Sequence, residues 1–214
     1  MEKTDAAQFV RTAREVFAPL YPVVAERIKE ETGITRGRCL DLGSGPGLLG
    51  LAMAEITELE VLLLDISPEM LVFAEEGIAE RERGSRVSTL LGDVHRIPLE
   101  SGSVDLVVSR GSVFFWEEPA RAFREVWRVL APGGYVWIGG GFGNGDMKRK
   151  ITAQMRERDP RWEPQVRERT SDFRLKAFRD ALAEAGIEKF LIDNDDRGFW
   201  IRFAKESLEG RPCR

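Results

Sequence analysis

The sequence predicts an α/β protein with a Rossmann-like, doubly wound sheet of seven strands, mostly parallel, that ends in a reversed C-terminal strand. Two observations support this prediction. Short, unbroken apolar runs alternate with helical stretches along most of the chain, as is typical of buried parallel strands joined by crossover helices. The last two apolar runs are separated by only a few polar residues and a glycine. This gap is too short for a crossover helix, so the two strands are expected to pair antiparallel.

The expected elements follow in chain order. Apolar residues recur at helical spacing from Asp5 to about Glu31 and are interrupted near Pro19 and Pro22, which predicts two helices joined by a bend. Strands are expected at 38–43, 60–66, 86–93, 104–109, 134–140, 188–195 and 198–205, and the remaining helices at 48–56, 68–83, 118–130 and 172–185.

Length and composition indicate one domain over residues 1–214, with a helical N-terminal extension at 1–35. The formal net charge of −4 argues against a general affinity for nucleic acid or anionic membrane, because both need a basic surface. No run of 18 apolar residues and no signal-peptide pattern occurs, so a cytoplasmic protein is expected. Cys39 is expected in the core and Cys213 in an exposed tail, and no clustered metal site is expected.

Two glycine patterns overlap after the first strand, within the stretch CLDLGSGPGLLG at residues 39–50. One is the G-x-G-x-x-G of a dinucleotide site, at Gly45, Gly47 and Gly50. The other is acid-x-G-x-G-x-G, which begins at Asp41. Both place a glycine turn at the carboxyl end of the first strand, where doubly wound sheets bind ligands. The glycines alone do not choose between cofactors.

Three acids at the ends of successive strands favour one cofactor over the other. Asp41 precedes the glycines, Asp65 ends the second strand and Asp93 ends the third, and the turn holds no Lys or Arg. A carboxylate beside a pyrophosphate would cost about 1 to 3 kcal/mol at an effective dielectric constant near 20. S-adenosylmethionine instead brings an ammonium and a sulfonium. An NAD-dependent oxidoreductase is therefore the less favoured alternative, and a non-catalytic domain that only retains the nucleotide is another.

These motifs resemble those of the class I S-adenosylmethionine-dependent methyltransferases over about residues 36–204. The resemblance rests on four motifs in order, LDLGSGPG, LLLDIS, GDVHRIPLESGSVDLVVS and LAPGG. It implies that Asp41 reaches the methionyl ammonium directly or through water, that Asp65 holds the ribose, and that Asp93 reads the adenine edge. The cofactor-binding set expected on this basis is Tyr21, Asp41, Gly43, Ser44, Gly45, Gly47, Asp65, Ile66, Gly92, Asp93, Val94 and Ser109.

The loop after the fourth strand is expected to meet the acceptor. Methyl transfer from a sulfonium can rely mainly on positioning, so a dedicated base is optional. The candidates for a catalytic role are His95, Ser109 and Arg110, although the favoured interpretation of His95 is that its side chain faces the nucleotide edge or solvent. Arg110 could bind a carboxylate or phosphate of the substrate, or pair with a surface acid. The residues expected to line the substrate are Arg110, Ser112, Phe114, Trp116, Phe142 and Asn144, with at least one of the aromatic residues after Val113 packing the next helix instead.

A glycine-rich segment at 139–146 leads into a basic one, and together residues 139–170 could form a cap insertion. Met147, Ile151 and Met155 give this segment one apolar stripe. This basic segment is interpreted either as a cap over the substrate or as a helix that packs on the core and exposes a basic face to solvent. The resemblance implies that Phe17 and Tyr21 could lie over the methionyl end of the cofactor, where aromatic faces suit a sulfonium; the alternative is that they pack in the core. The expected partner is a small-molecule substrate, with neither nucleic acid nor membrane, and the chain is expected to be a monomer or homodimer.

Overall fold

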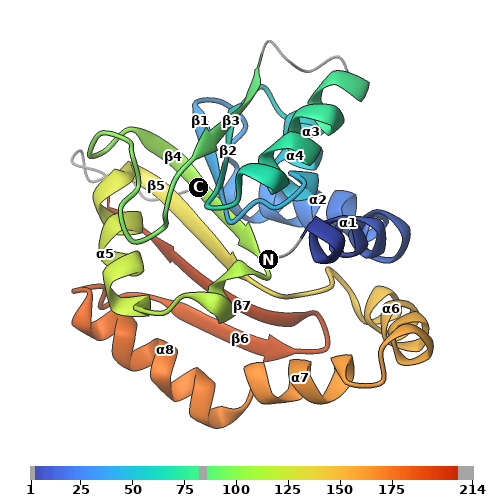
Figure 1. Cartoon of the computed structure of the whole chain (residues 1–214). Coiled ribbons are helices and arrows are strands. Elements are labelled where there is room, and N and C mark those ends of the chain that lie inside the picture. Colours follow the sequence, from blue (N-terminus) through green and yellow to red (C-terminus); the bar gives the residue numbers. More distant parts are fainter. Residues whose placement is uncertain (1–2, 82–85, 207–214) are drawn as a thin grey trace.

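The seven strands form a single sheet in the order β3-β2-β1-β4-β5-β7-β6 (Figure 1). The structure is a computed structural model that describes residues 3–81 and 86–206. Strand β7 runs antiparallel to both β5 and β6, and the other neighbours are parallel. The predicted sheet and its reversed C-terminal strand are therefore confirmed. The strands are β1 (Arg38–Leu42), β2 (Glu60–Asp65), β3 (Val87–Leu91), β4 (Val104–Arg110), β5 (Leu130–Gly139), β6 (Leu191–Asp195) and β7 (Gly198–Ala204).

The helices lie close to their expected places. The N-terminal bend falls at Pro19, and Pro22 sits in the first turn of the next helix, where a missing amide costs little. The expected end of the fourth helix at residue 83 and the expected exposure of Cys213 both lie outside the described residues. The helices are α1 (Lys3–Thr12), the π-helix η1 (Ala13–Phe17), α2 (Leu20–Thr32), α3 (Leu48–Ile56), α4 (Pro68–Glu80), the 3-10 helix η2 (Ser112–Phe115), α5 (Pro119–Val129), α6 (Gly145–Arg158), α7 (Trp162–Arg169) and α8 (Asp172–Glu184).

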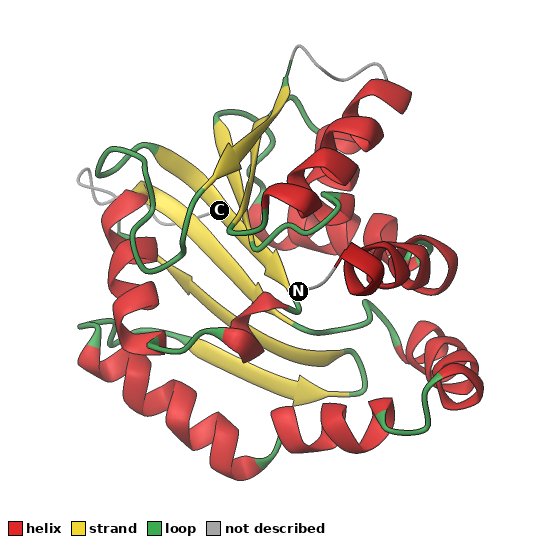
Figure 2. Cartoon of the chain, viewed as in Figure 1, coloured by secondary structure: helices red, strands yellow, loops and turns green. Residues whose placement is uncertain are grey.

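Helices cover both faces of the sheet, and each face has its own core (Figure 2). Alternate residues of β1 point to opposite faces: Cys39 joins the core beneath α2 and α3, whereas Leu40 and Leu42 join the core beneath α5 and α8. The Cys39 thiol is buried, which confirms its predicted place in the core, and this burial raises its pKa. No helix in the described ranges has the length and apolar content needed to cross a membrane.

The segment between β5 and α8 packs on the core through its predicted stripe. Ile151 and Met155 are buried in the first core, and Met147 packs against it. Several basic side chains of this segment pair with acids, among them Arg156 with Glu163 at 2.6 Å. The structure thus shows the core-packed arrangement of α6.

The glycine run after β5 lets backbone lie against the β6–β7 hairpin. A Cβ on Gly141 would overlap the indole of Trp200, and one on Gly140 would lie 2.6 Å from the Phe114 ring. The Gly140 amide donates to the Phe199 carbonyl at 2.9 Å, which holds the segment in place. These glycines therefore allow close approach of the backbone to neighbouring segments.

Candidate functional site

The glycine turn after β1 adopts a conformation that favours glycine. Gly43, Gly45 and Gly47 have φ values of 59°, 53° and 76°. A Cβ on Gly43 would overlap Ser112, and one on Gly47 would lie 2.6 Å from a methyl carbon of Leu63. A Cβ on Gly50 would also overlap Leu63. The last two glycines therefore let the start of α3 pack closely on β2, and this packing explains the G-x-G-x-x-G pattern without a pyrophosphate.

The Asp65 carboxylate links the ends of β1 and β2. Its Oδ2 accepts a hydrogen bond from the Gly45 amide at 2.8 Å, and its Oδ1 accepts one from the Ser67 amide at 2.9 Å. The side chain is largely buried. Next to it, Ile66 is 69% exposed, an unusual degree for a large apolar residue beside a buried acid. The carboxylate thus holds the turn in shape, and Ile66 offers an apolar face at the same edge.

Asp41 lies behind the turn and not on its surface. It is only 1% exposed, and its Oδ2 accepts a hydrogen bond from the Gly50 amide at 2.9 Å. Burial raises its pKa to about 7; the Gly50 hydrogen bond lowers the pKa, and the charge of Asp65 raises it. The carboxyl is therefore close to half-ionised at neutral pH. A cation at the turn would act on it through space or through water, since no open face of the side chain is available.

A buried polar atom in the turn supports the presence of a ligand there. The Ser44 Oγ is buried and has no hydrogen-bond partner among the described residues. Buried hydroxyls without a partner are rare because each costs about 1 to 3 kcal/mol. Together with the carboxylates of Asp65 and Asp93 and the absence of basic side chains in the turn, this unpaired hydroxyl fits a cationic nucleoside with polar groups.

Near the expected adenine edge, His95 makes structural contacts. Its Nδ1 lies 2.6 Å from Asp93 Oδ1, and the Glu118 amide donates to its Nε2 at 3.3 Å. The His95 amide also donates to Asp93 Oδ1, and this bond is the main cause of the lowered pKa of Asp93. The Asp93 carboxylate can only accept from Nδ1 and the Glu118 amide donates to Nε2, so the two contacts fit the tautomer with its proton on Nδ1. His95 thus joins this loop to the start of α5.

The other two residues expected in this loop have backbone roles. The Gly92 amide donates to the Asp65 carbonyl at 3.0 Å, and a Cβ on Gly92 would lie 3.0 Å from Pro98. Val94 packs against the second core. Its amide remains the feature expected to meet the adenine.

We expect the His95→Ala variant to transfer methyl groups at a rate within about tenfold of the wild type, because the substitution removes no catalytic base. We also expect its free energy of unfolding to fall by about 1 kcal/mol, because two hydrogen bonds of the His95 ring are lost. Steady-state methyl transfer and chemical unfolding would check both expectations, with His95→Gln as the variant that can still bond. A thousandfold loss of rate with unchanged cofactor binding would identify His95 as a base.

Ser109 of β4 and Ser112, just after it, make hydrogen bonds that join two strands of the sheet. Ser109 is fully buried, and its Oγ donates to the Leu42 carbonyl at 2.7 Å. The Ser112 Oγ lies 2.6 Å from the Ser109 Oγ and 2.9 Å from the same carbonyl. These contacts tie the end of β4 to the end of β1. A side chain as enclosed as Ser109 cannot meet an acceptor or a cofactor, so its predicted roles are not supported by its placement.

Arg110, the last residue of β4, has its guanidinium among aromatic rings. The carbon of the guanidinium lies 5.0 Å from the centre of the Phe17 ring, 5.4 Å from that of Tyr21 and 5.9 Å from that of Phe142. Its Nε donates to the Gly141 carbonyl at 3.0 Å. No acid within the described residues forms an ion pair with it. The predicted pairing with a surface acid is absent there, and the rings expected near a sulfonium face this guanidinium.

The remaining predicted substrate residues divide into packing and capping roles. Trp116 is buried against Phe123 of α5, with ring centres 5.5 Å apart, so it is the aromatic residue that packs the following helix. Phe114 packs against Phe199 at 5.5 Å. Asn144 is exposed and caps α6, where its Oδ1 accepts the Met147 amide. These packing and capping contacts account for the positions of Trp116, Phe114 and Asn144, and none of them requires a bound substrate.

Two residues near the site were not singled out from the sequence. Trp162, the first residue of α7, packs on both Phe17 and Phe142, with ring centres 6.2 Å apart in each pair. Phe9 of α1 is 53% exposed and lies over Gly45, whose Cβ would be 3.7 Å from its ring. Phe9 belonged to the predicted N-terminal stripe, and its exposure beside the turn is what distinguishes it. No comparable sequence signal exists for Trp162.

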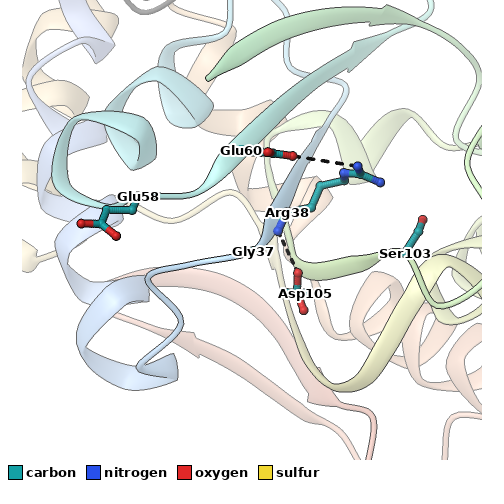
Figure 3. A pocket seen from close by; sticks show the side chains of 6 residues that line it. All are labelled: Gly37, Arg38, Glu58, Glu60, Ser103 and Asp105. Atoms are coloured by element: carbon teal, nitrogen blue, oxygen red, sulfur yellow. Dashed lines mark hydrogen bonds and ion pairs between the residues drawn. The ribbon is translucent and has the colours of Figure 1, made fainter. Parts of the chain in front are cut away.

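A separate hollow of about 410 Å³ lies at the opposite end of the strands (Figure 3). There the Arg38 amide donates to Asp105 Oδ2 at 2.7 Å, and the Arg38 side chain pairs with Glu60 at 3.9 Å. No cluster of acids, histidines or cysteines able to hold a metal ion occurs in the described part of the chain. The hollow lies where β1, β2 and β4 begin, whereas ligands of doubly wound sheets bind where strands end.

Comparisons with known proteins agree with this geometry. A family model described as a methyltransferase domain matches residues 40–138. A solved structure from Methanococcus maripaludis, described as a candidate S-adenosyl-L-methionine-dependent methyltransferase, is 41% identical, with a TM-score of 0.93 over 98% of this chain and 96% of that one. The chain belongs to the S-adenosylmethionine-dependent methyltransferases. Family membership assigns S-adenosylmethionine as the cofactor. It therefore favours the acid-x-G-x-G-x-G interpretation of the glycine turn over the dinucleotide pattern.

This methyltransferase also matches curated relatives over part of their length. It is 38% identical to the arsenite methyltransferase of Halobacterium salinarum over 46% of this chain and 26% of that one. It is 32% identical to the malonyl-[acyl-carrier protein] O-methyltransferase of Marinomonas over 61% of this chain and 49% of that one. The matched part of this methyltransferase spans less than half the length of each of these relatives.

Proposed function

We propose that this methyltransferase transfers the methyl group of S-adenosylmethionine to a small-molecule acceptor by in-line displacement, mainly through positioning. The observation that supports it most directly is the edge formed by Asp65, Asp93 and the glycine turn, which presents carboxylates and no basic side chain. The names of the two curated relatives refer to acceptors of different chemistry, arsenite and malonyl-[acyl-carrier protein]. They support the reaction class and do not single out an acceptor.

S-adenosylmethionine supplies an activated methyl group on a sulfonium when it is bound. Asp65 would hold the ribose hydroxyls with the lone pairs that Gly45 and Ser67 leave unused. The exposed face of Ile66 would receive the adenine, and Asp93 would bind its edge. Ser44 Oγ would gain the partner that it lacks. No side chain at this edge is placed as a base, so holding the acceptor in line would supply most of the acceleration.

The proposal also covers the partners and location. Acid pairing of basic residues in α6 and α7, as in Arg156 with Glu163 and Arg158 with Glu15, leaves less free positive charge for nucleic acid. We propose a cytoplasmic enzyme that works on a small molecule as a monomer or homodimer. Size-exclusion chromatography with light scattering would determine the oligomeric state.

Calorimetry and an acceptor panel test the proposed function. The purified protein is titrated with S-adenosylmethionine, S-adenosylhomocysteine and NAD. It is then incubated with methyl-labelled S-adenosylmethionine and a panel of thiols, amines, phenols and chalcogen oxyanions. We expect tight binding of both adenosyl compounds, no binding of NAD, and labelled product with one class of acceptor. Binding without any transfer would support the alternative of a non-catalytic nucleotide-binding domain.

A further inference from the structure

Arg110 carries a charge that has no acidic partner although its side chain is half-buried. Among the described residues it forms no ion pair, and its hydrogen bonds are one to the Gly141 carbonyl and a long one of 3.5 Å from Nη1 to Tyr21 Oη. Some arginines of the nearby helices are paired, such as Arg158 with Glu15 at 2.7 Å. A partly desolvated cation without a counter-ion is costly unless a ligand supplies one.

The surroundings of Arg110 orient its guanidinium. Its Nε is fixed by the Gly141 carbonyl, and the rings of Phe17, Tyr21 and Phe142 have their centres within 5.9 Å of the guanidinium carbon. Nη2 has no hydrogen-bond partner in the described ranges, and Nη1 has only the long one. The edge formed by Nη1 and Nη2 is the edge with which arginine binds carboxylate or phosphate in a bidentate manner. Because the ring contacts restrict the side chain, less entropy is lost on binding.

The position of Arg110 places it on the acceptor side of the proposed cofactor site. The glycine turn follows β1, Asp65 ends β2 and Asp93 follows β3, in one direction along the sheet. Arg110 ends β4 and bonds to Gly141 after β5, in the opposite direction. A guanidinium so placed would repel a cationic cofactor unless an anion lies between them.

We propose that Arg110 binds a carboxylate or phosphate group of the methyl acceptor, so that the acceptor is an anionic small molecule. This inference rests on the proposed function. The same chemistry could come from the carboxylate of the cofactor itself, and the experiment below separates these two sources.

The test uses the full chain saturated with S-adenosylhomocysteine and titrated by calorimetry with benzoate, inorganic phosphate and the neutral control benzamide. We expect at least one anion to bind saturably to the wild type and roughly tenfold more weakly to Arg110→Met. Arg110→Lys keeps the positive charge but loses the bidentate guanidinium edge, so it is expected to bind the anion severalfold more weakly than wild type. This variant replaces Arg110→Met in the test if the methionine variant does not fold. Arg36→Met, an exposed arginine paired with Glu58, is expected to bind as wild type. The binding of benzamide is expected to be the same in the wild type and in all variants.

A second arm compares S-adenosylhomocysteine with its decarboxylated analogue. We expect Arg110→Met to bind both within twofold of wild type. A tenfold loss for S-adenosylhomocysteine alone would show that Arg110 holds the cofactor carboxylate and would overturn the proposal, as would anion binding that ignores Arg110 or is absent. Failure of the wild type to bind S-adenosylhomocysteine would instead overturn the proposed function, and this inference with it.

Discussion

Asp65→Ala is expected to weaken binding of S-adenosylhomocysteine by about 1 to 3 kcal/mol, the range for a lost hydrogen-bonding charge in a buried place. The substitution removes the proposed ribose contact. It also releases the Gly45 and Ser67 amides, which Asp65 holds at 2.8 and 2.9 Å. The turn would then have to order itself on binding, which adds to the loss. Isothermal calorimetry at one pH and salt concentration measures the change.

Asp105→Ala is the matched control for Asp65. Asp105 also accepts a backbone amide, that of Arg38 at 2.7 Å, but it does so at the start of the strands (Figure 3). Its loss is expected to lower stability while leaving the affinity for S-adenosylhomocysteine unchanged. Equal affinity in the Asp65→Ala and wild-type proteins would contradict the ribose role of Asp65.

Asp41→Asn is expected to abolish a pH dependence of S-adenosylmethionine binding in the wild type between pH 6 and 8. The pKa of Asp41 is raised to about 7, mainly by burial. A cationic ligand favours the ionised carboxyl, so binding releases a proton and tightens as pH rises, by up to about tenfold per unit below the pKa. Above the pKa the affinity levels off. Calorimetry in buffers of different ionisation enthalpy measures the proton release directly.

The same carboxyl predicts a trend in stability. Because its folded pKa of about 7 lies above the ordinary value of 3.8, the stability that it contributes is fully present below pH 3.8 and is lost as pH rises toward 7. Asp41→Asn should remove this part of the pH dependence in thermal unfolding. Asp93→Asn is the matched control, because the pKa of Asp93 is lowered and lies outside this range.

The binding measurement has its own contrary outcome. If the affinity of the Asp41→Asn protein for S-adenosylmethionine kept the wild-type dependence on pH, a group other than Asp41 would be the source of that dependence.

The sheet and the glycine turn could be predicted because their signals are local. Apolar runs predicted the parallel strands, and the short gap before Gly198 predicted the antiparallel hairpin that pairs β6 with β7. Strand-end acids and glycine spacing predicted a cationic cofactor at the end of β1. Local patterns suffice here because strand periodicity, turn conformation and strand ends depend on neighbouring residues.

The side chains that contact the methyl acceptor could not be predicted from the sequence to the same extent. Ser109, Trp116 and Asn144 all lie at or beyond strand ends on the predicted side of the sheet, yet they bond to Leu42, pack on Phe123 and cap α6. Sequence spacing places a residue at the end of a strand, but it does not say which way the side chain turns or which distant element meets it. That direction depends on tertiary packing.

The sequence by itself therefore determined the fold class and the cofactor, and it predicted the edge of the sheet at which the cofactor is expected to bind. Only the tertiary structure decided that Asp41 is enclosed behind the turn and that His95 joins two loops. It also decided that Arg110 lies among rings from η1, α2 and the β5–α6 loop, with no ion pair to any acid in the part of the chain that the structure describes. The physical reason is that burial and charge pairing are set by contacts between segments far apart in the chain, and no local pattern records them.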